Sequence, residues 1–164
     1  WLIMERCLML KEAKVTVNIL NWLEQEGWEI ICYDFPQSGT GIMLHPNNQE
    51  GSKSKNQDGI IPDIVAVKNG KVVFFENKDR FVLSDFEKIW GIKSSNKYSI
   101  SLRKLINSPD DLNIFYGIGI PQANKHVEKS MNHLDKVDFI ISVSEDGVIR
   151  VEYDEYLVFQ QIHV

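Results

Sequence analysis

The sequence is poor in cysteine, and it does not open on a segment that could target it to a membrane. Its two cysteines, Cys7 and Cys32, are too few and too far apart for a zinc site or a disulfide framework, as is typical of a reducing compartment. The apolar run at residues 1–4 meets charged residues too early for a signal peptide or a membrane span. We therefore expect a cytoplasmic protein without a membrane partner.

The sequence also lacks the local motifs of several enzyme classes. It contains no glycine-rich phosphate loop, no nucleophile elbow, no C-x-x-C pair and no internal repeat. Its 164 residues, 43% of them hydrophobic and 25% charged, have the size and composition of one ordinary globular domain with a substantial core. We therefore predict a single domain over residues 1–164.

Positive charge is scarce overall but concentrated in one segment. The net charge of −5 is unlike that of most nucleic-acid-binding proteins, yet residues 80–104 carry six basic and only two acidic side chains. A protein that holds cations with its own carboxylates can be acidic overall and still offer phosphates a local positive surface. A solvated helix surface is the alternative. The candidate nucleic-acid contacts are Lys88, Lys93, Lys97, Arg103 and Lys104.

The strongest local pattern is a hairpin over residues 61–78. Two β-branched, apolar runs flank Asn69-Gly70, which favours a type I′ turn because that turn needs positive φ at both central residues. A two-residue turn fixes the register, so Asp63 is predicted to lie directly opposite Glu76. Lys78 follows two residues later and belongs to the same face. The pattern predicts three charged side chains together at the open end of an apolar strand pair.

Two adjacent carboxylates repel each other unless a cation lies between them. Their oxygens suit a hard divalent ion such as Mg²⁺. A lysine beside that ion could orient or deprotonate an attacking water, or stabilise charge on a phosphate. The alternative is a surface salt-bridge cluster in which Lys78 only neutralises Glu76.

A helix is predicted before the hairpin, over about residues 11–26. Val15, Ile19 and Leu23 recur there at helical spacing. Glu12 lies on the same stripe, where a carboxylate that faces the core needs a partner. It is either a further ligand of the metal site or an acid in the first helical turn, where the helix dipole favours negative charge.

The other elements alternate between helices and strands. Residues 37–59 show no period, and a loop of this length within a domain is usually functional or disordered. It could close over a substrate, and a solvated loop without such a role is the alternative. Ser84-Asp85-Phe86-Glu87 has the pattern of a capping box that begins a helix. The remaining predictions are strands at 28–35 and 112–120, helices at 98–106 and 121–134, and a C-terminal hairpin at about 138–156.

With this order of elements, Pro62-Asp63 followed by Glu76-Asn77-Lys78 resembles the PD-(D/E)xK nuclease superfamily, which has the restriction-endonuclease-like fold. The resemblance covers about residues 11–134. It implies a three-layer α/β/α domain with a mixed central sheet. It also implies that Asp63, Glu76 and the backbone carbonyl of Asn77 bind Mg²⁺, for which Mn²⁺ substitutes. Lys78 would be the catalytic lysine, and Glu12 matches a glutamate that many members carry on the first helix.

The function that this resemblance implies is Mg²⁺-dependent cleavage of double-stranded DNA. The glutamine and tyrosine signature of the exonuclease branch is not evident after Lys78, and the long loop favours a restriction or defence endonuclease. A Holliday-junction resolvase or repair nuclease is the alternative within the enzyme class. A catalytically inert subunit that binds DNA or a partner is the alternative outside it. A homodimer is expected, because one carboxylate cluster attacks one phosphodiester at a time.

Overall fold

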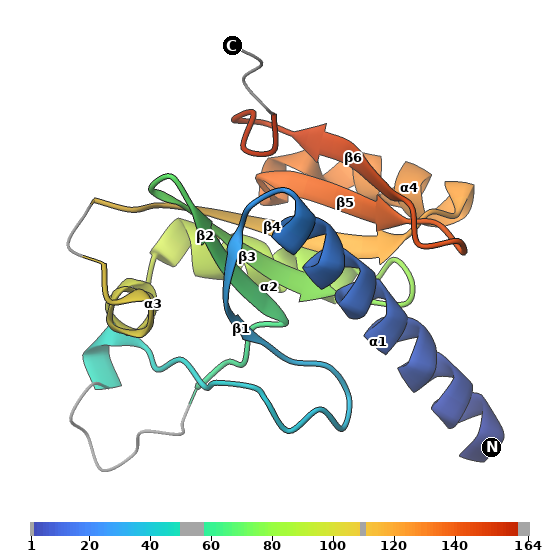
Figure 1. Cartoon of the computed structure of the whole chain (residues 1–164), viewed down its shortest axis with the longest axis horizontal. Helices are drawn as coiled ribbons and strands as arrows, with labels where there is room; N and C mark the ends of the chain where they lie inside the picture. The colour runs from blue at the N-terminus through green and yellow to red at the C-terminus, as the bar shows by residue number, and fades with distance from the viewer. Residues whose placement is uncertain (1, 50–57, 109–110, 161–164) are drawn as a thin grey trace.

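In the computed structural model, which describes residues 2–49, 58–108 and 111–160, six strands form one mixed sheet in chain order (Figure 1). The central strands β3, β4 and β5 are parallel, and the other pairings are antiparallel. The strands are β1 (Glu29–Tyr33), β2 (Ile64–Lys68), β3 (Lys71–Asn77), β4 (Asn113–Pro121), β5 (Phe139–Val143) and β6 (Ile149–Asp154). The predicted C-terminal hairpin is therefore the β5–β6 edge of the same sheet.

Helices cover both faces of this sheet (Figure 1). On one face, α1 (Leu2–Gln25) packs its apolar stripe against Val73 and Phe75 of β3. On the other face, α2 (Leu83–Ser95), α3 (Ser99–Ile106) and α4 (Asn124–Ser130) share a core with Val72 and Phe74. Each fully buried large apolar side chain of this kind contributes about 1.5–3 kcal/mol. The predicted α/β class, with three α/β/α layers and a mixed central sheet, is confirmed.

The hairpin has the predicted turn and register. Asn69 and Gly70 have φ values of 50° and 78°, as a type I′ turn requires. Lys68 lies opposite Lys71, and the pairing continues without a shift to Ile64 opposite Phe75. The strand pair therefore carries its side chains on the faces that the sequence predicts.

Three predicted boundaries are wrong. The first helix begins at Leu2 rather than near Lys11, because the residues before Lys11 also favour helix. The predicted capping box is absent: Val82, in an extended conformation, is the N-cap of α2, and no side chain caps it. Pro121 ends β4 instead of opening a helix, which its missing N–H allows at the end of a strand.

The loop after β1 is anchored on α3. It contains a 3₁₀ helix, η1 (Asn47–Gln49), and an isolated bridge between Leu44 and Ile60. The backbone N–H of Asn47 donates to the Lys97 carbonyl at 2.7 Å. Residues 50–57 of the predicted 37–59 loop lie outside the described residues, and closure over a substrate stays a prediction. A second 3₁₀ helix, η2 (Met131–Lys136), follows α4.

Within the described ranges, no helix is long and apolar enough to cross a membrane.

The turn that sets the register should be sensitive to a side chain at Gly70. Gly70→Ala places a Cβ on a residue with φ of 78°, so it should lower the free energy of unfolding by about 1–2 kcal/mol. Gly91→Ala is the matched control, because Gly91 lies within α2 with open space where a Cβ would go. It should be neutral or stabilise by up to about 1 kcal/mol. Urea unfolding measures both, and equal losses would contradict the turn assignment.

Candidate active site

The predicted charged residues meet at the carboxyl end of β3, beside the residues that precede β2. The β2–β3 ladder ends at the pair Ile64 and Phe75, so Asp63 and Glu76 are the next residues beyond it. The backbone N–H of Asn77 donates a 2.6 Å hydrogen bond to Asp63 Oδ2. The Asp63 side chain is therefore held against the end of β3.

The charge of Glu76 disfavours the ionised form of Asp63. Burial, and after it the negative charge of Glu76, raises the pKa of Asp63 to about 8 from an ordinary value of 3.8. Burial also raises the pKa of Glu76, although the ammonium group of Lys88 acts in the opposite direction. The register of the strand pair places the two residues side by side at the end of the hairpin, so two destabilised carboxyl groups are held there.

Glu76 is buried, and one of its two carboxylate oxygens lacks a hydrogen-bond partner among the described residues. Its side chain points toward α2, where Lys88 Nζ donates to Glu76 Oε1 at 3.0 Å. The residue is 7% exposed, and Oε2 has no hydrogen-bond partner among the described residues. A buried carboxylate oxygen without a donor is unfavourable. A bound cation would satisfy it.

α1 brings Glu12 to the same place. Lys78 Nζ lies 3.5 Å from Glu12 Oε1. Because α1 begins at Leu2, Glu12 lies near the middle of the helix, and the first-turn alternative for this residue is wrong. We call Glu12, Asp63, Glu76 and Lys78 the carboxylate site. In the alternative of a salt-bridge cluster, the ion-pair partner of Lys78 is Glu12 rather than Glu76.

Lys78 is held as a cation. Burial lowers its pKa, but the nearby carboxylates of Glu12, Asp85 and Glu76 raise it more, so the net shift is upward. An ammonium group donates hydrogen bonds and stabilises negative charge, but it cannot accept a proton from water. Of the roles that the sequence allows for Lys78, this geometry favours charge stabilisation.

The side chain of Asn77 has a structural role, separate from the metal ligation predicted for its backbone carbonyl. Its side chain is fully buried toward α1, where Nδ2 donates to Thr16 Oγ1 at 3.1 Å. A Cβ at Gly119 would lie 2.2 Å from Asn77 Oδ1 and 2.5 Å from Ile19 Cδ1, so only glycine fits there. The close contact fixes the end of β3 between α1 and β4. Coordination of a metal by the Asn77 carbonyl stays a prediction.

Asp85 is a further acid near the site that the sequence patterns do not single out. It lies in the first turn of α2, is 8% exposed, and its Oδ2 has no partner in the described part of the chain. Burial raises its pKa, while Lys78 and Lys88 act in the opposite direction. The capping-box interpretation concealed it, since that motif assigns roles to Ser84 and Glu87. An acid three residues before Lys88, immediately after the hairpin, is the signal that could have found it.

Lys88 and Lys93, two of the predicted nucleic-acid contacts, form ion pairs with buried acids. Lys88 pairs with Glu76, and Lys93 Nζ lies 2.7 Å from Asp138 Oδ1 across the α2 face of the sheet. Lys97, Arg103 and Lys104 are exposed. Nucleic-acid contact by these five residues stays a prediction.

A cleft of about 690 Å³ lies beside the carboxylate site. It runs between α1, the loop after β3, the ends of β4 and β5, and the start of α4. Lys11 and Lys125 are exposed residues of its wall. His126 also lines it, and its Nδ1 accepts a 3.2 Å hydrogen bond from the Phe81 N–H. The neutral imidazole therefore carries its proton on Nε2.

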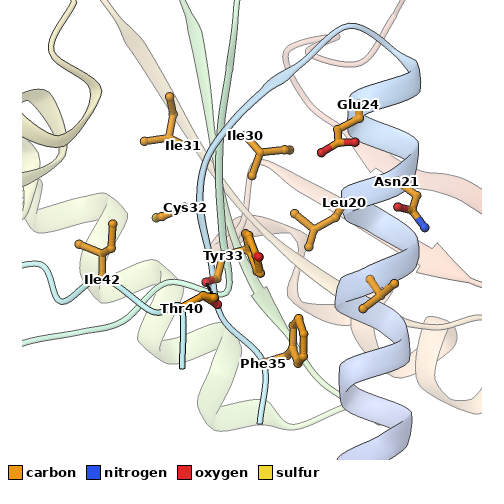
Figure 2. Close-up of a pocket in the computed structure, with 11 residues that line it drawn as sticks. Leu20, Asn21, Glu24, Ile30, Ile31, Cys32, Tyr33, Phe35, Thr40 and Ile42 are labelled. Atoms are coloured by element: carbon orange, nitrogen blue, oxygen red, sulfur yellow. Dashed lines mark hydrogen bonds between the residues drawn. The ribbon is translucent and has the colours of Figure 1, made fainter. Parts of the chain in front are cut away.

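A second hollow, of about 540 Å³, lies between α1 and the edge strand β1. Figure 2 shows that Leu20 of α1 and Ile30, Tyr33 and Phe35 from β1 and the following loop border the space between the two elements. Its wall is mainly apolar and includes none of the predicted site residues. It is therefore not the candidate active site.

Across residues 2–49, 58–108 and 111–160, no group of three or more histidine, cysteine, aspartate or glutamate side chains is arranged to hold a metal ion. The predicted ligand set contains only two such side chains, Asp63 and Glu76, with a backbone carbonyl as the third ligand. Metal binding therefore stays a prediction, supported by the unused oxygen of Glu76.

Comparison with known proteins finds only weak structural similarity. No protein-family model and no curated protein sequence matches the chain. A crystal structure of an XisH family protein from Nostoc punctiforme is 16% identical, with 84% of this chain and 96% of that chain covered and a TM-score of 0.42. An fdxN element excision controlling factor protein from Anabaena variabilis is 19% identical, with 85% and 95% covered and a TM-score of 0.41. Similarity at this level carries no functional argument.

The stability of the metal-free protein should depend on pH through Asp63. Its pKa is about 8 in the folded protein and 3.8 ordinarily, so the folded state retains a proton that the unfolded chain releases. This contribution to stability is complete below about pH 4 and is lost as the pH rises through about 8. Thermal unfolding in EDTA should show a melting temperature that falls over this range.

Asp63→Asn, which removes the titrating group, is the matched variant for this measurement. It should flatten the pH dependence of the melting temperature. An unchanged slope in the variant would show that Asp63 is not a buried, destabilised carboxylate.

Proposed function

We propose that the protein is a Mg²⁺-dependent endonuclease that hydrolyses phosphodiester bonds in double-stranded DNA. The observation that carries this proposal is the pairing of a half-buried Asp63 with a buried Glu76 whose Oε2 has no hydrogen-bond partner among the described residues. Such a pair is unfavourable without a cation. Lys78, held by Glu12, adds the charged donor that a phosphate substrate needs.

The available donors fit a hard divalent cation. Asp63 and Glu76 would hold Mg²⁺ or Mn²⁺, with the backbone carbonyl of Asn77 as a further ligand, since these ions prefer oxygen ligands. When bound, such an ion polarises the phosphate and lowers the pKa of a coordinated water. The unused Glu76 Oε2 supports this assignment.

The other residues of the site act on the substrate or on each other. The Lys78 ammonium group would donate to a phosphate oxygen and stabilise the negative charge that develops during attack. Glu12 would orient Lys78 through the 3.5 Å ion pair. Lys88 holds Glu76 toward α2 through its bond to Oε1.

The cleft beside the site offers lysine contacts for phosphates. Lys11 is adjacent to Glu12 in sequence, and Lys125 faces the same cleft from the start of α4. The wall also carries three acids, Asp79, Glu145 and Asp146, so the lysines act as individual contacts and not as a positive surface. Lysine side chains contact phosphates without regard to base sequence. We place the DNA backbone along this cleft, with the exposed Lys97, Arg103 and Lys104 as more distant contacts.

A restriction or defence role rests on the resemblance of the sequence alone, and a Holliday-junction resolvase or repair nuclease would use the same chemistry. A catalytically inert subunit is the competing proposal. The geometry disfavours it, because a binding protein gains nothing from placing a half-buried Asp63 beside a buried Glu76 at an energetic cost.

Cleavage should require each carboxylate and the lysine. With Mg²⁺, the protein should nick or cut plasmid DNA, and EDTA should abolish the reaction. Asp63→Asn, Glu76→Gln and Lys78→Ala should each reduce the rate at least about 100-fold, while DNA binding persists. Glu87→Gln is the control, since Glu87 is an exposed acid on α2. Binding without cleavage by the unaltered protein would favour the inert subunit.

We also propose a homodimer, since one chain supplies one carboxylate site and double-strand cleavage needs two sites or two successive nicks. Sedimentation of the free protein and of its DNA complex measures this directly. A monomer in both samples that only nicks supercoiled plasmid would contradict the dimer and indicate a nickase.

A further inference from the structure

We propose that Asp85 is a further acidic residue of the cation site, contributed by α2, which acts on the bound ion through a coordinated water. This inference rests on the proposed metal-dependent function. It starts from a buried carboxyl group that the fold does not otherwise use. Asp85 is 8% exposed, and its Oδ2 has no partner among the residues that the structure describes.

α2 presents Asp85 toward Glu76. Asp85 and Lys88 are three residues apart, so they share one helix face with Cβ atoms about 5–6 Å apart. Lys88 Nζ donates a 3.0 Å hydrogen bond to Glu76 Oε1, so this face of α2 is directed at Glu76. The negative charge of Asp85 also acts on both Glu76 and Lys78. Asp85 therefore borders the carboxylate site from the side opposite Glu12.

Helix capping does not account for this carboxyl group. The N-cap of α2 is Val82, and no side chain accepts a hydrogen bond from the first turn. The backbone N–H of Asp85 donates to the Val82 carbonyl at 3.1 Å, so the turn is closed by the main chain. A buried carboxylate oxygen left unsatisfied costs about 1–3 kcal/mol or more. Retaining Asp85 rather than an apolar residue therefore points to a ligand.

The unpartnered carboxyl oxygens point to a divalent cation as that ligand. Lys78 pairs with Glu12, and Lys88 pairs with Glu76. Oε2 of Glu76 and Oδ2 of Asp85 are left without a hydrogen-bond partner in the described part of the chain, and a hard divalent cation suits such oxygens. The direct ligands stay those proposed above, and Asp85 would act on the ion through a coordinated water. Mg²⁺ and Mn²⁺ keep such waters, which nearby carboxylates orient.

Titration calorimetry with Mn²⁺ on the full chain tests this assignment without relying on activity. Asp85→Asn removes the charge and keeps the shape, and it should weaken Mn²⁺ binding about 10–100-fold. Glu87→Gln removes the same charge from an exposed position on the same helix and should leave the dissociation constant within about twofold. Asp85→Glu, which keeps the charge, should recover most of the affinity.

Three outcomes would separate the possibilities. In the first, Asp85→Asn binds Mn²⁺ with unchanged affinity and has a higher melting temperature in EDTA. This result would overturn the proposal, because Asp85 would then affect only the stability of the fold. No Mn²⁺ binding by the unaltered protein would overturn it as well. Normal Mn²⁺ binding that depends on Asp85, without DNA cleavage, would sustain the assignment of Asp85 and overturn the endonuclease function instead.

Discussion

The pairing of β2 with β3 across the Asn69-Gly70 turn is the constraint on which the site depends. The turn fixes a register that ends at Ile64 opposite Phe75, and this places Asp63 beside Glu76. A slip of one residue would reverse the face of every side chain on one strand and separate the two carboxyl groups. The parallel pairing of β3 with β4 then keeps Lys78 at the same end of the sheet.

Charged side chains from the helices on both faces of the sheet surround Asp63 and Glu76. α1 contributes Glu12 from one face, and α2 contributes Asp85 and Lys88 from the other. Burial raises the pKa of Asp63, Glu76 and Asp85 together, so the metal-free protein holds several carboxyl groups that are unfavourable as anions. Natural proteins retain such unfavourable groups mainly at functional sites. The proposed cation would relieve this instability by binding between the carboxyl groups.

Sequence patterns predicted the local features and failed where one element docks on another. The turn residues and the alternation of apolar side chains determine the hairpin register, so the meeting of Asp63 with Glu76 could be predicted. The partner of Lys93 could not, because Asp138 is far away in sequence and is brought near only by packing of α2 on the sheet. Asp85 was missed for a related reason: Ser84 and Glu87 match a local capping motif, but the chain begins the helix at Leu83.

A crystal structure of the protein soaked in Mn²⁺, with anomalous diffraction recorded at the manganese absorption edge, tests the central claim most directly. The account predicts an anomalous peak bonded to carboxylate oxygens of both Asp63 and Glu76, with Lys78 on the same side. No peak at this position, with Glu76 still bound only to Lys88, would contradict it.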